Sequence, residues 1–233
     1  MNKKNGRVIC ITGIDTDIGK TIVTGLLARH LAKGGNNVIT QKICQTGCVG
    51  ISEDIVLHRE IMDISLTEAD LEGLTCPYVF TEPCSPHLAA NLDGKQIDPD
   101  YITKATEQLR RQYDFVIVEG VGGLMVPLLA DLTLVDYFYG LDYSHVLVSS
   151  SRLGSINHTL SALEIMHSRK LLVEGLVYNN FQETHEAIVD DSARIFKLYL
   201  RKYGYPEKVI PMSDYKENGY GSIDFSSLIK QYK

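Results

Sequence analysis

Runs of consecutive apolar residues alternate along the chain with segments whose apolar residues recur every three or four positions. The first kind is typical of β-strands buried on both faces, and the second of helices that pack one face against a core. The strand-type runs are 7–12, 38–43, 115–119, 145–149, 172–178 and 208–210. The helix-type segments are 22–33, 53–62, 99–112, 155–169, 187–203 and 225–232. This alternation predicts an α/β fold: a doubly wound, mostly parallel sheet with helices on both faces.

Two helix starts are marked by a capping residue followed by proline, at Ser85-Pro86 and at Asp98-Pro99. Elsewhere between residues 66 and 98 the pattern is weak. No internal repeat or low-complexity linker interrupts the 233 residues, so we expect residues 1–233 to form a single domain.

The first strand-type run leads into a loop bounded by glycines, residues 13–21, which read GIDTDIGKT. A phosphate-binding P-loop is usually spelled G-x-x-x-x-G-K-[ST], and here the first glycine stands one position early. The strand before and the helix after the loop nevertheless favour a P-loop that binds a nucleoside triphosphate. Lys20 would then lie near the β- and γ-phosphates, and the Thr21 hydroxyl would bind Mg²⁺.

Ligands bind at the carboxyl ends of the strands in such a sheet. Three charged residues there are candidates for chemistry. Glu119 ends a buried strand, where P-loop proteins place a carboxylate near Mg²⁺, although a solvated carboxylate would fit as well. Asp54 begins a helix and is either a second metal ligand or a carboxylate stabilised by the helix dipole. Lys42 stands in an apolar strand, so it either has an anionic partner or reaches solvent at an edge.

Charge and composition narrow the function classes. A net charge of −6 without a basic run argues against general nucleic-acid binding. No run of about 20 apolar residues predicts a membrane span and no secretory segment is evident, so we expect a cytoplasmic location. The five cysteines include no C-x-x-C pair and predict reduced thiols, with no metal role for Cys44 or Cys48.

Six blocks of the sequence together resemble dethiobiotin synthetase, an ATP-dependent ligase of biotin biosynthesis. Its P-loop has the same additional residue. The blocks are residues 13–21, Lys42 with 46–47, 52–54, 82–87, 118–123 and 153–158. The sequence departs from the family pattern at Ile43, where proline is usual, and at Val121, where alanine is usual. Neither departure removes a functional group.

The resemblance implies that 7,8-diaminononanoate, CO₂ or bicarbonate, and Mg-ATP are the reactants, and that the chain forms a homodimer. One amine would form a carbamate, ATP would convert it to a carbamic–phosphoric anhydride, and the second amine would close the cyclic urea. Lys42 and Lys20 are the expected catalytic residues. Thr21, Asp54 and Glu119 are the expected Mg²⁺ ligands.

The resemblance also implies which residues bind ATP. Among them, Asn179 would contact the edge of the purine. The expected set is Asp17, Ile18, Gly19, Lys20, Thr21, Ile22, Asp54, Glu119, Gly120, Val121, Gly122, Asn179, Asn180, Pro211, Met212 and Ser213.

The substrate would contact a second set of residues. At Ser155 a helix is expected to begin whose free N–H groups bind the substrate carboxylate in the neighbouring subunit's site. We expect Asp to be tolerated at Ser155 as a helix cap. The expected set is Thr16, Lys42, Thr46, Ser155, Ile156 and Asn157.

Three other nucleotide-dependent classes fit less well. Partition and arsenite-pump ATPases carry a second lysine near the start of the P-loop, where this chain has Asp15. A guanine-nucleotide switch would have Asn-Lys-x-Asp after a late strand, where residues 179–182 read NNFQ. An amidotransferase of cobalamin synthesis needs a glutaminase domain, for which 233 residues leave no space.

Overall fold

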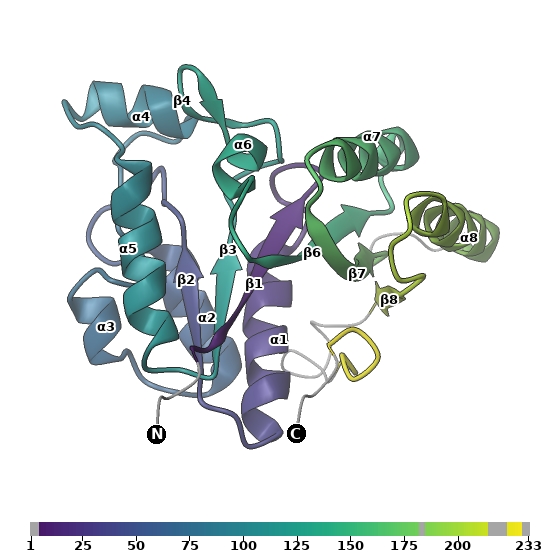
Figure 1. Ribbon diagram of the computed structural model, residues 1–233, viewed down its shortest axis with the longest axis horizontal. Coiled ribbons are helices and arrows are strands. Elements are labelled where there is room, and N and C mark those ends of the chain that lie inside the picture. Colours follow the sequence, from purple (N-terminus) through teal and green to yellow (C-terminus); the bar gives the residue numbers. More distant parts are fainter. Residues whose placement is uncertain (1–4, 182–184, 214–222, 230–233) are drawn as a thin grey trace.

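A six-stranded parallel sheet forms the centre of the protein. The computed structural model describes residues 5–181, 185–213 and 223–229. The strand order is β2-β3-β1-β6-β7-β8, and every neighbouring pair is parallel (Figure 1). The strands are β1 (Arg7–Gly13), β2 (Val38–Lys42), β3 (Phe115–Glu119), β6 (Ser144–Ser150), β7 (Leu172–Asn179) and β8 (Val209–Met212). The predicted α/β fold is therefore confirmed.

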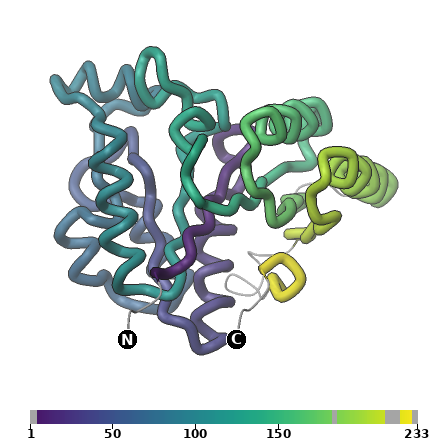
Figure 2. Tube along the Cα trace, viewed as in Figure 1, coloured from purple at the N-terminus to yellow at the C-terminus, as the bar shows by residue number. Residues whose placement is uncertain are grey.

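Helices connect the strands and cover both faces of the sheet. The chain builds the β2–β3–β1 side first and then the β6–β7–β8 side, as the colours of the tube show (Figure 2). The helices are α1 (Lys20–Lys33), α2 (Glu53–Met62), α3 (Glu68–Leu71), α4 (Pro86–Leu92), α5 (Pro99–Arg110), α6 (Leu134–Phe138), α7 (Ser155–Ser168) and α8 (Glu186–Lys202). A separate antiparallel pair, β4 (Pro127–Leu129) and β5 (Leu132–Thr133), lies before α6.

The two faces of the sheet pack into two hydrophobic clusters. Along β1, Val8 and Cys10 face the cluster that includes apolar side chains of α5, α7 and α8. Ile9 and Ile11, which alternate with them, face the cluster that includes α1 and α2. Because both faces are covered, all four side chains are 0–1% exposed. This double burial explains why the strands are continuous apolar runs in the sequence.

Two predictions near the end of the chain need correction. The strand predicted before Pro211 continues through it as β8, which is an edge strand, where a residue without an N–H is tolerated. The helix predicted for 225–232 is wrong in its described part, because 226–229 form a turn. The apolar spacing there reflects the burial of Phe225 and Leu228 in the cluster with α1. Residues 230–232 lie outside the described part.

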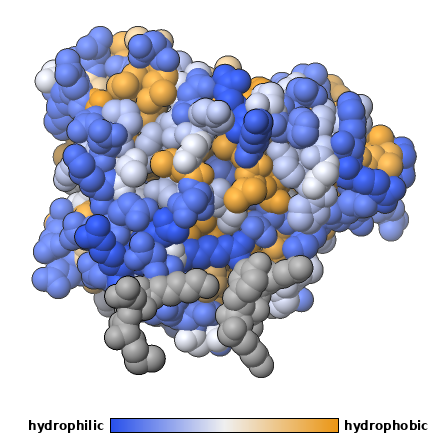
Figure 3. All heavy atoms as spheres, viewed as in Figure 1, coloured by the Kyte–Doolittle hydropathy of each residue, from blue (hydrophilic) through white to orange (hydrophobic). Residues whose placement is uncertain are grey.

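The surface seen in Figure 3 is mostly polar, with separate apolar groups. One group at the upper left lies where Figure 1 places α4, on which Leu88 and Leu92 are exposed. Within the described residues, no helix combines the length and apolar character that crossing a membrane requires.

Candidate active site

The P-loop connects the end of β1 to the start of α1 and is held against β7. Gly19 has φ 95°, a conformation that favours glycine, and an added Cβ would lie 2.8 Å from the Asn179 side-chain nitrogen. That nitrogen donates to the carbonyl oxygen of Ile18 over 2.9 Å. The glycine therefore permits the close contact through which Asn179 holds the loop.

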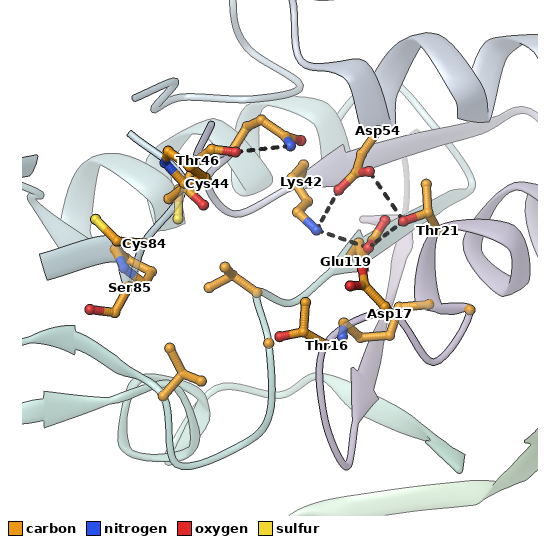
Figure 4. A pocket seen from close by; sticks show the side chains of 18 residues that line it. Thr16, Asp17, Thr21, Lys42, Cys44, Thr46, Asp54, Cys84, Ser85 and Glu119 are labelled. Carbon is orange, nitrogen blue, oxygen red and sulfur yellow. Dashed lines mark hydrogen bonds and ion pairs between the residues drawn. The ribbon is translucent and has the colours of Figure 1, made fainter. Parts of the chain in front are cut away.

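A cavity of about 660 Å³ opens beside the P-loop, at the carboxyl ends of β2 and β3 (Figure 4). Most of the residues expected to bind the phosphates, the metal and the reacting end of the substrate line it. They are Thr16, Asp17, Gly19, Lys20, Thr21, Lys42, Thr46, Asp54, Glu119, Val121 and Gly122. Residues from four separate segments thus meet at one edge of the sheet, as expected for a parallel α/β fold.

Lys42 joins two carboxylates at the wall of this cavity. Its Nζ lies 2.7 Å from Oδ2 of Asp54 and 2.8 Å from Oε1 of Glu119. The Thr21 hydroxyl oxygen lies 3.2 Å from Oδ1 of Asp54 and 3.0 Å from the same Glu119 oxygen. Lys42 and Glu119 are 5% and 1% exposed, so the alternatives of a solvated carboxylate and a lysine reaching solvent do not hold.

The ionisation of this cluster follows from its contacts. Burial acts to lower the pKa of Lys42, but the negative charges of Glu119 and Asp54 outweigh it and raise the pKa above its usual value. Burial acts to raise the pKa of Glu119, but Lys42 and a hydrogen bond from His58 hold the pKa well below its usual range. Lys42 is therefore a cation and Glu119 an anion in the same buried space.

In contrast, no carboxylate among the described residues directly contacts Lys20. Its Nζ donates to the carbonyl oxygen of Asp15 over 2.5 Å. Burial, together with the positive charge of Lys42, lowers the pKa of Lys20 to about 8. A phosphate placed beside Lys20 would favour the protonated ammonium, which is the form that a P-loop uses.

Two further residues at the site, His58 and Arg59 on α2, were not predicted from the sequence. Nε2 of His58 lies 2.8 Å from Oε2 of Glu119, and the imidazole is fully buried. His58 stands four residues after Asp54, and this spacing, which places two side chains on one helix face, could have identified it.

Arg59 fixes α2 to its neighbours. Its guanidinium pairs with Asp70 (Nη2 to Oδ1, 2.7 Å) and donates to the Thr40 hydroxyl on β2 over 2.7 Å. Burial acts to raise the pKa of Asp70, but hydrogen bonds from Arg59 and Thr75 and the charge of Arg59 outweigh it and lower the pKa to about 2. This buried pair holds the helix that carries Asp54 and His58.

The oxygen atoms of Thr21, Asp54 and Glu119 fit a magnesium site. Mg²⁺ is commonly held by one or two carboxylates, with water and phosphate oxygens completing its shell. The described residues contain no group of three or more His, Cys, Asp or Glu side chains that could hold a metal ion. A hydroxyl and two carboxylates beside the P-loop match Mg-nucleotide binding rather than a metal cage made of protein alone.

Asn179, which is expected to contact the purine base of ATP, does not line the main cavity. Asn179 lines a second, smaller cavity of about 90 Å³ together with Asp17, Ile18 and Gly19. Its amide is already engaged, because it also accepts from the Phe181 N–H over 3.2 Å. The purine contact of Asn179 stays a prediction.

Neither cavity is lined by the remaining expected ATP-binding residues, which are Ile22, Gly120, Asn180, Pro211, Met212 and Ser213. The Gly120 carbonyl accepts from Lys42, Met212 is buried near Gly19, and the Asn180 N–H donates to Met212. Ile22 is half-buried on α1, and both Pro211 and Ser213 are exposed.

The start of α7 differs from expectation at Ser155. Gly154, with φ 92°, precedes the helix, and Ser155 is its first residue, so the expectation that Ser155 is the cap is wrong. Ser155 is 5% exposed and hydrogen-bonds the Ser150 hydroxyl over 2.9 Å, so an aspartate there would be buried. Ile156 and Asn157 are exposed, and none of these three residues lines the main cavity.

Fold and loop together define a P-loop nucleotide-binding protein. Residues 7–202 match a family model described as an AAA domain. The septum site-determining protein MinD from Pyrococcus horikoshii, complexed with Mg-ADP, superposes with a TM-score of 0.57 at 17% identity, covering 92% of this chain and 84% of that one. A ParA family ATPase from Chlorobium tepidum superposes with a TM-score of 0.52 at 17% identity, covering 89% of this chain and 85% of that one. At these identities the likeness shows the fold alone.

Sequence relatives specify the family. The ATP-dependent dethiobiotin synthetase BioD of Chlorobaculum tepidum is 51% identical over 214 residues, covering 92% of this chain and 89% of the relative. BioD 2 of Pasteurella multocida is 49% identical, and the match covers 84% of this chain and 92% of the relative. BioD of Lysinibacillus sphaericus is 39% identical, and the match covers 95% of this chain and 96% of the relative. The chain belongs to the dethiobiotin synthetase family, which are ATP-dependent ligases. The resemblance carried by the six sequence blocks is confirmed.

Proposed function

We propose that this protein converts 7,8-diaminononanoate, CO₂ and ATP to dethiobiotin, ADP and phosphate, with Mg²⁺, in the cytoplasm. The observation that carries the proposal is the meeting of Lys20, Lys42, Thr21, Asp54 and Glu119 at one cavity. A carbamate and a triphosphate repel each other, so their reaction needs cations and N–H donors on both sides. The cavity offers two lysines and the N-terminus of α1.

The cavity also suits the shape of the substrate. Its volume of about 660 Å³ lies in the range of small-molecule sites. Pro83, Val121 and Val126 offer apolar surface to an aliphatic chain, and the hydroxyls of Thr16 and Thr46 can hydrogen-bond the substrate nitrogens or the carbamate.

The reaction would proceed in three steps. One amine combines with CO₂ and releases a proton to form the carbamate. A carbamate oxygen then attacks the γ-phosphorus, ADP leaves, and a carbamic–phosphoric anhydride results. Finally the second amine attacks the carbonyl carbon, loses a proton and expels phosphate, which closes the cyclic urea.

The residues of the chain act mainly through charge in this sequence. Lys20 would bind the β- and γ-phosphates. Lys42, whose pKa is raised because Glu119 and Asp54 outweigh its burial, stays protonated and would stabilise the carbamate as a hydrogen-bond donor rather than act as a base. Thr21, Asp54 and Glu119 would hold Mg²⁺, which when bound neutralises charge on the phosphates.

The substrate carboxylate would be bound across a homodimer. Leu153, just before α7, is fully exposed, and the side chain of Ile156 is partly exposed. We expect a second copy of the chain to cover them, which would bring the N-terminus of α7, with Asn157, to the neighbouring site. N–H groups at a helix N-terminus suit a carboxylate.

A direct assay tests the proposal. The purified chain is incubated with 7,8-diaminononanoate, ¹³C-bicarbonate, ATP and Mg²⁺, and the products are followed by mass spectrometry. We expect a cyclic urea carrying one ¹³C, formed only when ATP is present and with one ADP for each product molecule. ATP hydrolysis without urea formation would contradict the proposal.

A further inference from the structure

His58 lies behind the proposed Mg²⁺ site, on the side of Glu119 away from Thr21. Its imidazole is 0% exposed, and Nε2 lies 2.8 Å from Oε2 of Glu119. Asp54 stands one helical turn earlier on α2, so a single helix face carries both the carboxylate that contacts Thr21 and the imidazole that contacts Glu119.

The two oxygens of Glu119 have different partners. Oε1 accepts from the Lys42 ammonium over 2.8 Å and from the Thr21 hydroxyl over 3.0 Å. Oε2 faces His58. A carboxylate that is paired with an ammonium only accepts hydrogen bonds, so the proton between His58 and Glu119 belongs to Nε2 of the imidazole.

The other ring nitrogen of His58 supports the same tautomer. Nδ1 is buried and has no hydrogen-bond partner among the residues that the structure describes. A proton on Nδ1 would therefore be a buried donor without an acceptor, and it would also leave Nε2 facing the carboxylate lone pair to lone pair. The neutral ring with its proton on Nε2 avoids both costs.

We propose that His58 is a positioning residue, whose Nε2–H group holds Oε2 of Glu119 and so turns Oε1 toward Thr21 and the Mg²⁺ site. The inference rests on the proposed function, because that function supplies the metal ion. Without the imidazole, only Lys42 and Thr21 would orient the carboxylate, and because both donate to the same oxygen, either oxygen of Glu119 could rotate toward them. The carboxylate would then spend less time in the orientation that suits the metal.

Two variants separate positioning from packing. His58→Leu removes the donor and keeps an apolar side chain of similar volume. His58→Gln places an amide N–H near the position of Nε2 and restores the donor. His145→Leu serves as the control, because His145 is another fully buried histidine, on β6 and outside the site.

The first readout is the Mg²⁺ affinity of the ADP complex, measured by calorimetry. Groups that orient a metal ligand typically contribute about 10- to 100-fold to metal affinity, so we expect His58→Leu to weaken Mg²⁺ binding by about tenfold or more. ADP binding without Mg²⁺ should stay at the wild-type level. His58→Gln should recover most of the loss, and His145→Leu should bind Mg²⁺ as the wild type does.

The second readout is the ¹⁵N spectrum of the metal-free wild-type protein, with His58 assigned by its absence in His58→Gln. We expect protonated Nε2 and bare Nδ1. A bare Nε2 would overturn the proposal even if His58→Leu fails to fold. Wild-type Mg²⁺ affinity in His58→Leu would overturn it too, as would an equal loss in both His58 variants.

These measurements are independent of the substrate. If the wild type binds Mg-ADP but forms no cyclic urea, the proposed function fails and the role of His58 stands. If urea forms and His58→Leu leaves Mg²⁺ affinity unchanged, only the role of His58 fails.

Discussion

Lys42 and Glu119 are register partners at the carboxyl ends of the neighbouring strands β2 and β3, and their side chains form an ion pair 2.8 Å long. Asp54 on α2 completes the cluster by approaching the same ammonium at 2.7 Å. The parallel register therefore places a lysine between the two carboxylates that we propose as metal ligands. Substrate and Mg²⁺ would share these groups, with the ammonium directed to the carbamate and the carboxylates to the metal.

Lys42→Ala should lower turnover by about 10² or more, the scale for losing one preorganised charge at a developing anion. ADP binding should be largely kept, because Lys20 and the P-loop amides remain. The rate of urea formation and calorimetric ADP binding check the two expectations. Lys95→Ala, at an exposed side chain outside the cavity, is the matched control and should keep wild-type turnover. A Lys42→Ala rate within a few-fold of wild type would contradict a role in the chemistry.

Glu119→Gln should raise the Mg²⁺ concentration needed for half-maximal rate by about tenfold or more, because a negatively charged oxygen ligand becomes neutral with nearly the same shape. The amide would also place an N–H group against a donor, either His58 or Lys42, so we expect some loss of thermal stability. Initial rates over a Mg²⁺ series measure the first effect. An unchanged Mg²⁺ dependence would place the carboxylate outside the metal shell.

Asp70 should contribute stability that is lost in acid. Burial acts to raise its pKa, but hydrogen bonds from Arg59 and Thr75 and the charge of Arg59 outweigh this effect and lower the pKa from an ordinary value of 3.8 to about 2. This contribution is fully present above pH 3.8 and disappears as the pH falls through 2. The lowering corresponds to about 2 kcal/mol.

Asp70→Asn should therefore be less stable than wild type near pH 7, by about 3 kcal/mol or more, because the buried Arg59 loses its counter-charge. Urea unfolding at a series of pH values should show this difference shrinking by about 2 kcal/mol between pH 5 and pH 2. Asp131→Asn, at an exposed residue, is the control and should show little change. A difference that is constant with pH would mean that Asp70 is not held ionised by Arg59.

A mixed-dimer experiment tests the shared site. Asn157 is exposed in the first turn of α7, where aspartate suits the helix dipole, so Asn157→Asp should fold and repel the substrate carboxylate. If Lys42 and Asn157 serve one site from different subunits, a mixed dimer of one Lys42→Ala chain and one Asn157→Asp chain has one site with both defects and one with neither. Random mixing should then restore about a quarter of wild-type activity, since half of the dimers are mixed. No recovery, with mixed dimers shown to form, would place both residues in the same subunit's site.

The parts of the fold that the sequence predicts are those whose burial is uniform. Residues 115–119 form an apolar run because β3 is covered on both faces, and the glutamate at its end falls at the ligand edge. The elements between 127 and 138 are too short to show a period. The apolar residues at 225–229 look helical because a single buried turn has the same spacing as a helix.

The residues of the candidate site also differ in how far the sequence predicts them. A functional motif that lies within one contiguous segment, such as the P-loop, can be recognised from the sequence. The partners of Lys42 could not be identified in this way, because Asp54 and Glu119 approach it from different elements and each was compatible with a solvated role. His58 shows no motif of its own, and only its position one turn after Asp54 connects it to the site.

Oxygen labelling gives the sharpest test of whether a carbamate oxygen attacks ATP in this cavity. Fresh C¹⁸O₂ is mixed with enzyme, 7,8-diaminononanoate and Mg-ATP in unlabelled water, and a single turnover is stopped within seconds, before the label exchanges. We expect one ¹⁸O in the released phosphate and one in the carbonyl of the cyclic urea, because the two carbamate oxygens separate when phosphate leaves. Unlabelled phosphate released together with labelled urea would contradict attack by the carbamate oxygen.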